Sequence, residues 1–313
     1  MSMVDLLKPA QSPLSGRFLL TGLLPTVACG IFLIGLLAAG APGRDFSPQR
    51  AWAGVAALGN GQLLILGLAV VLTALVMAPL QLALVRLLEG GWPAWLCREW
   101  ARRRQRRRRD QSADRARITV PSGGRAPTDW EVQRAGSASV ELQRRFPRAH
   151  LIRETALGNV LAAMEDTAGR VYGMDAVVAW PRLYPVLSPT VRMIVDARRD
   201  ALDTATQLAV SGAVTGVVAL ALLVRTGPWI LLAGAPLVLS VVAYRGAVQV
   251  ALAYAEAVCA SFDLHRFDLL RLLHLPLPAD HETEMTLNTT LCLQWRQQVP
   301  LEVRYRHDEP TGG

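Results

Sequence analysis

The chain has 313 residues, of which 51% are hydrophobic and only 6% are aromatic, and its formal net charge is +8. The mean hydropathy of +0.27 is high for a soluble protein with a basic run, and most of the hydrophobic content is Leu, Ala and Val, as in lipid-facing helices. The four cysteines form no CxxC pair and have no histidine at ligand spacing. This argues against a zinc site or a disulfide framework, and we expect no cofactor.

Two uncharged stretches, Phe18–Gly40 and Leu63–Val85, predict a first pair of transmembrane helices within residues 18–86. Each has 23 residues, which at 1.5 Å per residue is ~34 Å and enough to cross the ~30 Å hydrocarbon core. A signal peptide cleaved near Ala39–Ala41 is the alternative for the first stretch. Its apolar run is longer than the usual ~7–15 residues of a signal peptide, which favours a retained span.

Residues 87–140 are predicted to be a basic juxtamembrane segment and a flexible linker, because Asp110–Val140 is rich in Ser, Gly, Pro and charge. Residues 141–203 are predicted to be helical. Apolar side chains recur there at i, i+3, i+4 and i+7, and Ser188-Pro189 is typical of a helix N-terminus. The four apolar positions are Leu157, Val160, Leu161 and Met164.

A second transmembrane hairpin is predicted within residues 204–250. Its helices are Thr204–Val224 and Trp229–Tyr244, the latter continuing past Arg245 with the guanidinium reaching the headgroups. The chain after it, residues 251–313, is predicted to continue that helix to about Leu273, break near Pro278 and form a last helix over 280–297.

The distribution of arginine predicts the orientation. Four spans place residues 1–17, the middle region and the C-terminal region on one side, which then carries 30 of the 33 basic residues. By the positive-inside rule that side is cytoplasmic. The predicted fold is therefore an all-α polytopic protein of the inner cell membrane, with four transmembrane helices, a helical cytoplasmic domain and both termini cytoplasmic.

Eight arginines lie within Arg98–Arg109, directly after the first pair of spans. Attraction to anionic lipid headgroups and the setting of topology are the favoured interpretation. Nucleic acid is the weaker alternative, since only Trp100 interleaves the run and no reader module surrounds it. The candidate headgroup residues are Arg98, Arg102, Arg103, Arg104, Arg106, Arg107, Arg108 and Arg109.

Small residues at four-residue spacing predict close helix packing. They are Gly212 and Gly216 in the third span, and Gly22, Thr26 and Gly30 in the first. This pattern fits packing within one chain as well as a homo-oligomer interface.

Three polar residues of the third span, Gln207, Ser211 and Thr215, share one helical face. They are candidates for lining a pore, although hydrogen bonds between helices are the favoured interpretation. No Asp, Glu, His or Lys lies deep in a predicted span, which argues against a proton-coupled transporter.

Two groups of ionisable residues are weaker candidates for a metal or catalytic site, and no Walker loop, GxSxG, HExxH or dinucleotide fingerprint occurs. The first group is Asp263, His265 and Asp268, for which a charged helix face is the favoured interpretation. The second group is Glu165, Asp166 and Asp175, a candidate cation site.

The stretch Leu157–Pro185, followed by a membrane hairpin and the sequence FDLHRFDLLR, resembles stretches of uncharacterised multi-pass membrane proteins of actinobacteria. The resemblance implies no activity. The order of two spans, a cytoplasmic domain, two spans and a tail is also similar to the layout of bestrophin-type anion channels, without a motif of that family.

The sequence therefore predicts a non-enzymatic membrane scaffold or signalling component that binds a cytoplasmic protein partner. The alternative is an oligomeric ion channel or pore in which the third span lines the axis.

Overall fold

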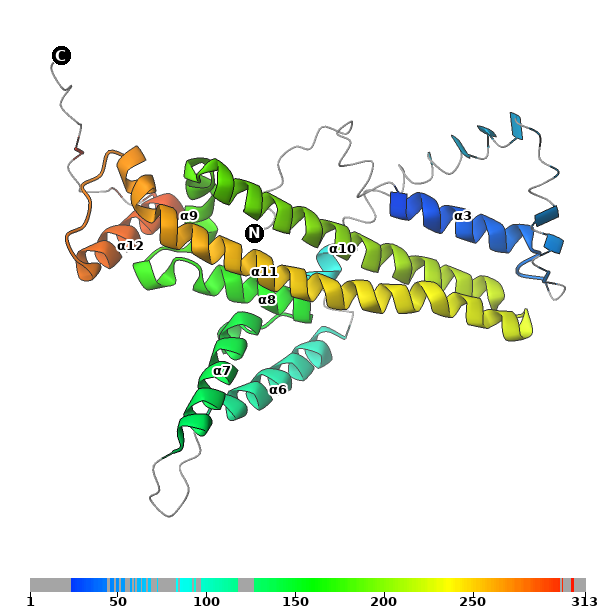
Figure 1. The fold of residues 1–313 in the computed structure, drawn as a ribbon, viewed down its shortest axis with the longest axis horizontal. Coiled ribbons are helices and arrows are strands. Elements are labelled where there is room, and N and C mark those ends of the chain that lie inside the picture. The colour runs from blue at the N-terminus through cyan, green and yellow to red at the C-terminus, as the bar shows by residue number, and fades with distance from the viewer. Residues whose placement is uncertain are drawn as a thin grey trace. The chain divides into compact units, whose positions relative to one another are not determined.

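The computed structural model describes residues 24–43, 97–117 and 127–298, with scattered positions among residues 46–93 and positions 300, 305 and 306. These described residues form helices and no strand, which confirms the all-α prediction for them. The α-helices are α3 (Leu24–Ala38), α6 (Arg98–Ala116), α7 (Asp129–Arg145), α8 (Ala156–Thr167), α9 (Ala176–Leu183), α10 (Pro189–Leu223), α11 (Gly234–Leu272) and α12 (His281–Gln297) (Figure 1). The 3-10 helices are η2 (Ala149–Leu151), η3 (Arg170–Tyr172), η4 (Tyr184–Val186) and η5 (Gly227–Ala233).

The chain divides into two compact units, and the long helices α10 and α11 each contribute residues to both. The boundaries near residues 88, 199 and 249 lie within four residues of the predicted domain boundaries at 86, 203 and 250. Of the described residues, those within 89–199 and 250–306 belong to unit 1, and those within 24–88 and 200–249 belong to unit 2.

Two helical stretches, Pro189–Leu223 and Gly227–Leu272, are long and apolar enough to cross a membrane by length and composition. Among the described residues, 11% of the most apolar window of the second stretch is buried. A third apolar helix, Thr26–Ala38, is shorter. The predicted span Leu63–Val85 lies largely outside the described residues, so two of the four predicted spans are supported in this way.

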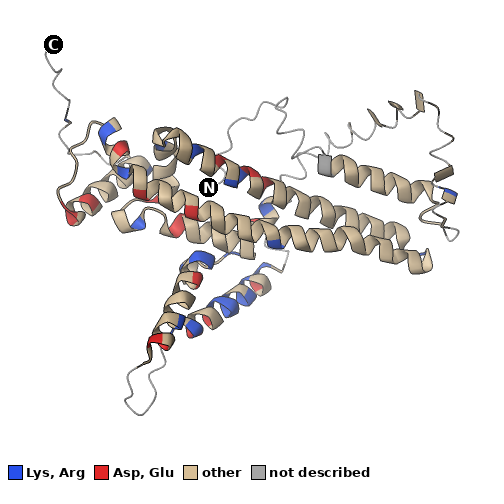
Figure 2. Ribbon diagram, viewed as in Figure 1, with Lys and Arg blue, Asp and Glu red and all other residues tan. Residues whose placement is uncertain are grey.

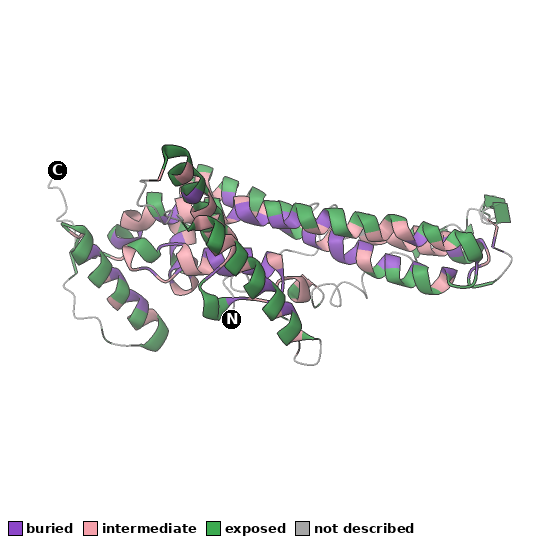
Figure 3. Cartoon of the chain, turned by 90° about the horizontal axis from the view of Figure 1, so that it is seen from below, coloured by how far each residue is buried: buried purple, intermediate pink, exposed green. Residues whose placement is uncertain are grey.

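In unit 2, α10 packs closely against α11 through the predicted small residues. A Cβ atom on Gly212 would lie 2.9 Å from the carbonyl oxygen of Pro236, and one on Gly216 would collide with Leu237. The Ser240 hydroxyl donates to the carbonyl oxygen of Ala209 at 2.7 Å. Figure 3 shows the buried residues along the facing sides of the two helices. Gly212 and Gly216 thus lie at a helix contact within one chain.

The other residues proposed for the membrane helices have different outcomes. Gly30 lies half-buried in α3, and Gly22 lies outside the described residues. Ser211 and Thr215 are only 5% and 3% exposed, and Gln207 is half-buried. Ser211 and Thr215 face the interior of unit 2 rather than an open surface, which favours helix packing over the pore-lining prediction.

The core of unit 1 is built around α8 and α9. Leu157, Val160, Leu161 and Met164 are each at most 1% exposed, which confirms the apolar face predicted for this helix. Trp180 of α9 is fully buried, and its ring stacks at a tilt 5.9 Å from that of Phe262 on α11. This core orders the loops that surround α8.

Several predicted helix ends are also confirmed. Helix α10 begins at Pro189, and the Ser188 hydroxyl accepts from the amide of Val191 at 3.4 Å. Helix α11 ends at Leu272, near the predicted break. Helix α12 follows, with the Asp280 carboxylate accepting from the amide of Thr283 at 2.8 Å.

The predicted flexible linker is wrong for most of its length. Helix α6 extends through Ala116, and α7 begins at Asp129 under a capping box between Thr128 and Glu131. The two helices pack against each other (Figure 1). Capping and pairwise packing outweigh the weak intrinsic helix preference of a Ser- and Gly-containing sequence. Cys97, at φ 43°, precedes α6 and is exposed.

Candidate functional site

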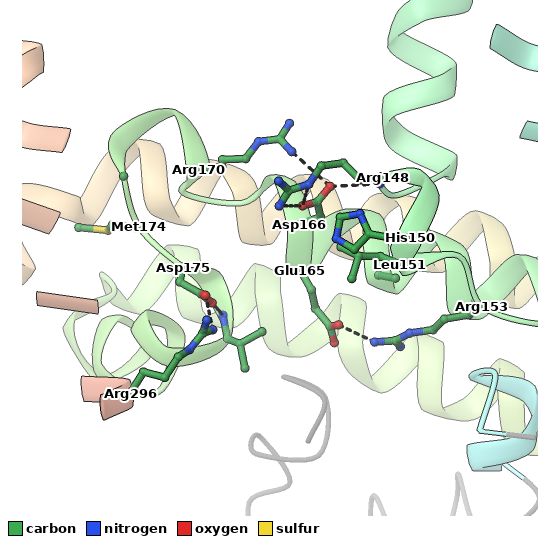
Figure 4. A pocket seen from close by; sticks show the side chains of 13 residues that line it. Arg148, His150, Leu151, Arg153, Glu165, Asp166, Arg170, Met174, Asp175 and Arg296 are labelled. Carbon is green, nitrogen blue, oxygen red and sulfur yellow. Dashed lines mark hydrogen bonds and ion pairs between the residues drawn. The ribbon is translucent and has the colours of Figure 1, made fainter. Parts of the chain in front are cut away.

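A cavity of about 480 Å³ lies in unit 1, beside α8 and the end of α12 (Figure 4). Its size is suited to a small organic ligand. The charged side chains that line it are Arg148, Arg153, Arg170, Arg296, Glu165, Asp166 and Asp175, with His150 beside them, and the apolar ones include Leu151, Ala162, Met174 and Val177.

The segment that carries the first arginines is fixed by a buried asparagine. Asn159 of α8 is 0% exposed. Its side-chain oxygen accepts from the amide of Arg153 at 2.8 Å, and its amide nitrogen donates to the carbonyl oxygens of Arg153 and Thr155. These bonds hold the chain between α7 and α8 against the N-terminal turn of α8, and so position Arg148 and Arg153 at the cavity.

The loop after α8 is fixed by glycine. Gly173 has φ +74°, and a Cβ atom there would lie 2.5 Å from the carbonyl oxygen of Met285 on α12. Only glycine combines this left-handed conformation with so close an approach. Asn288 of α12 donates to the carbonyl oxygen of Tyr172 at 2.8 Å. The loop that bears Asp175 is thereby held against α12, which carries Arg296.

Asp166 is the centre of the charge network in the cavity (Figure 4). Its side chain is only 2% exposed, yet it binds two guanidinium groups: Arg148 at 2.5 Å and Arg170 at 3.2 Å. The amide of Arg148 also donates to it at 3.3 Å. One carboxylate therefore neutralises only one of the two arginines that it positions.

The other two acids of the cavity are each bound by an arginine as well. Arg153 binds Glu165 at 2.6 Å, and Arg296 binds Asp175. Four arginines against three carboxylates leave the cavity with one net positive charge before His150 is counted.

The candidate cation site is therefore wrong, although its three acids do lie around one cavity. Each of Glu165, Asp166 and Asp175 is bound by at least one guanidinium, which competes with a metal ion for the carboxylate oxygens. No group of three or more metal-ligating side chains occurs among the residues that the structure describes.

The other group, Asp263, His265 and Asp268, is only partly brought together. His265 Nδ1 lies 3.0 Å from Asp268, and its Nε2 accepts from the amide of Ser188 at 3.5 Å. Asp263 instead accepts from the hydroxyl of Tyr172 at 2.9 Å. The charged-face interpretation fits this arrangement.

Two tyrosines of unit 1 are held in their protonated form. Burial, together with the hydrogen bond to Asp263, raises the pKa of Tyr172. Burial and a 2.6 Å hydrogen bond to Asp196 raise the pKa of Tyr184 to about 12. Both hydroxyls are therefore donors at neutral pH, and neither is suited to act as a base.

The arginine run forms helix α6, and two of its members face inward. Arg98 and Arg102 bind Glu154 at 2.7 and 2.8 Å, and the Glu154 side chain is 0% exposed. Glu154 thus holds Arg98 and Arg102 against unit 1, and a contact of these two arginines with headgroups stays a prediction. Arg109 is half-buried beside Asp110.

The remaining arginines form the exposed face of α6 (Figure 2). Trp100 lies among them, 63% exposed, with the Arg104 guanidinium 5.6 Å from its ring centre. Trp130 on α7 is equally exposed under Arg134. We call the five exposed arginines the basic face; they are Arg103, Arg104, Arg106, Arg107 and Arg108.

Sequence reasoning missed Glu154 and the arginines of the cavity, because their partners are distant along the chain. Glu154 lies 56 residues from Arg98, and Asp175 lies 121 residues from Arg296. The chain matches no protein-family model, no curated protein and no solved structure.

Proposed function

We propose that this chain is a non-enzymatic integral membrane protein that acts as a scaffold or signalling component. In this proposal the chain crosses the inner cell membrane four times, as the sequence predicts. Both termini and unit 1 lie in the cytoplasm. In this proposal unit 1 binds a protein partner, and α6 rests on anionic headgroups.

The observation that carries the proposal is the basic face of α6. Its five arginines are exposed and have no carboxylate partner among the described residues, whereas Arg98 and Arg102 are occupied by Glu154. Basic residues close to an anionic membrane surface contribute roughly 1 kcal/mol each. Exposed tryptophans such as Trp100 are typical of the membrane–water interface. The arginines of the basic face are therefore the ones that are free of carboxylate partners among the described residues and accessible to anionic headgroups.

Limited trypsin digestion of the full chain in nanodiscs tests this contact. We expect nanodiscs with anionic lipid to slow cleavage after Arg103, Arg104, Arg106 and Arg107 by at least ~5-fold relative to zwitterionic nanodiscs, because several charge contacts of roughly 1 kcal/mol each must be broken. Mass spectrometry gives the rate at each bond. At about 1 M salt the Debye length is ~3 Å, and the protection should disappear.

Cleavage after Arg271, which lies outside both α6 and the cavity of unit 1, is the internal control and should not depend on the lipid. The triple variant R103Q/R106Q/R107Q should lose the protection that remains at Arg104 and Arg108. Equal cleavage rates at α6 in both kinds of nanodisc would refute the headgroup contact.

The pore is the weaker candidate, because Ser211 and Thr215 are buried within one chain. Planar-bilayer recording of the purified protein distinguishes the two functions. The scaffold proposal expects no conductance. A conductance from a ring of subunits, altered by Ser211→Leu, would replace it with the pore.

A further inference from the structure

The cavity of unit 1 combines a surplus of positive charge with several apolar lining residues, and the ion pairs that line it do not cancel that surplus. Asp166 binds both Arg148 and Arg170, whose side chains remain 60% and 48% exposed. Arg170 uses only Nη1 in its contact with Asp166. A guanidinium has five N–H donors, so both arginines keep donors for a further anion.

We propose that this cavity binds a phosphate monoester. Two guanidinium groups fixed on one carboxylate can each donate a charge-assisted hydrogen bond to a phosphate. A phosphate fits this pair better than a carboxylate does, because its three terminal oxygens can accept from both guanidinium groups at once. The organic part of the ester packs against apolar side chains that line the cavity, such as Leu151 and Val177.

The arrangement of Asp166 explains why two arginines can lie side by side before a ligand arrives. Its buried carboxylate accepts from Arg148 Nε at 2.7 Å and from Arg170 Nη1 at 3.2 Å, which offsets their repulsion. The site is therefore pre-organised, and a ligand has little ordering of these side chains to bring about.

Phenyl phosphate is the probe, titrated by calorimetry into the full chain in detergent. We expect saturable binding with a Kd below ~1 mM, and binding of benzoate that is at least ~10-fold weaker, because a carboxylate loses one charge-assisted contact. Arg170→Gln should raise the Kd for phenyl phosphate by ~10-fold or more for the same reason, while Asp166 keeps Arg148 as its partner.

Arg271→Gln is the matched control. Arg271 is also an exposed arginine of unit 1 bound to an aspartate, Asp268 at 3.0 Å, but it lies outside the cavity. Its replacement removes the same charge and should leave the Kd unchanged. An equal loss in both variants would show a general charge effect and overturn the cavity site.

A second variant guards against misfolding. Arg170→Lys keeps the charge but removes the planar fork, so it should weaken binding while the melting temperature stays at the wild-type value. No saturable binding of phenyl phosphate to the wild-type chain, or wild-type affinity in both Arg170 variants, would refute the proposal.

A phosphate monoester can be a soluble metabolite or the headgroup of a lipid. Nanodiscs that contain phosphatidic acid separate the two sources: a lipid ligand blocks phenyl phosphate binding, and a soluble ligand leaves it intact. The trypsin experiment on α6 does not involve this cavity, so either proposal can fail without the other.

Discussion

Glu154 shows how one residue decides the role of its neighbours. Its fully buried carboxylate forms ion pairs with two arginines of the basic run and so gives them a structural role. Removing one partner of a buried ion pair is costly, because the other charges lose their compensation. The basic run is thus divided between a structural side and an open side.

Glu154→Gln is therefore expected to lower the free energy of unfolding by about 2–4 kcal/mol; the range starts below that for fully buried pairs because Arg98 and Arg102 are partly hydrated. Thermal unfolding in detergent should show a melting temperature lower by several degrees. Glu141→Gln, in the exposed pair with Arg145, is the control and should change it little. An unchanged melting temperature in Glu154→Gln would show that the buried contact is dispensable.

Tyr184 makes a second residue-level prediction, on pH. The folded pKa of about 12 is above the ordinary tyrosine pKa of 10.0, so the protonated hydroxyl stabilises the fold below pH 10. That contribution is lost as the pH rises from 10 to about 12, because the unfolded chain ionises first.

Tyr184→Phe should cost about 1 kcal/mol at pH 8, the value of a partly exposed hydrogen bond to a carboxylate. The difference from the wild type should then shrink between pH 10 and 12, measured by urea unfolding. A difference that is constant across this pH range would contradict the assigned hydrogen bond.

At the scale of the elements, the close contact between α10 and α11 depends on the glycines Gly212 and Gly216, which have no side chain. Gly212 lies against backbone atoms of α11, which cannot move aside by a rotamer change as a side chain could. Close approach of this kind makes up for the poor helix propensity of glycine.

Gly212→Ala should destabilise the protein by about 1–3 kcal/mol, the usual effect of overpacking, even though alanine is the better helix former. Its Cβ would lie 2.9 Å from Pro236 O and 3.1 Å from Ser240 N. Gly246→Ala on α11 is the matched control, since nothing lies within 4 Å of its Cβ position. It should be neutral or slightly stabilising, and thermal unfolding that ranks the two variants the other way round would disprove the packing role.

For the whole molecule, the sequence predicted helices far better than contacts. The start of α10, the end of α11 and the extent of α12 follow from local signals: Ser188-Pro189, the break before Pro278 and the Asp280 cap. Such signals act within one turn of a helix, so a single sequence reveals them.

The parts that the sequence did not predict depend on contacts between distant segments. Helix α7 could not be recognised from its sequence, because it packs against another polar helix, α6, and so lacks a strongly apolar face. The acids of the cavity were recognised together, but their charge was misjudged, since Arg148, Arg170 and Arg296 reach them only in the folded chain. Charge balance at a site is a property of the tertiary structure.

The exposed thiol of Cys97 has a practical consequence. The other three cysteines are half-buried or buried, so a maleimide reagent should modify this position first. It lies one residue before the helix that carries the basic face. An impermeant reagent added to sealed vesicles would thus report which compartment α6 occupies, and a fluorophore attached there would sense its distance from the bilayer, both without an engineered residue.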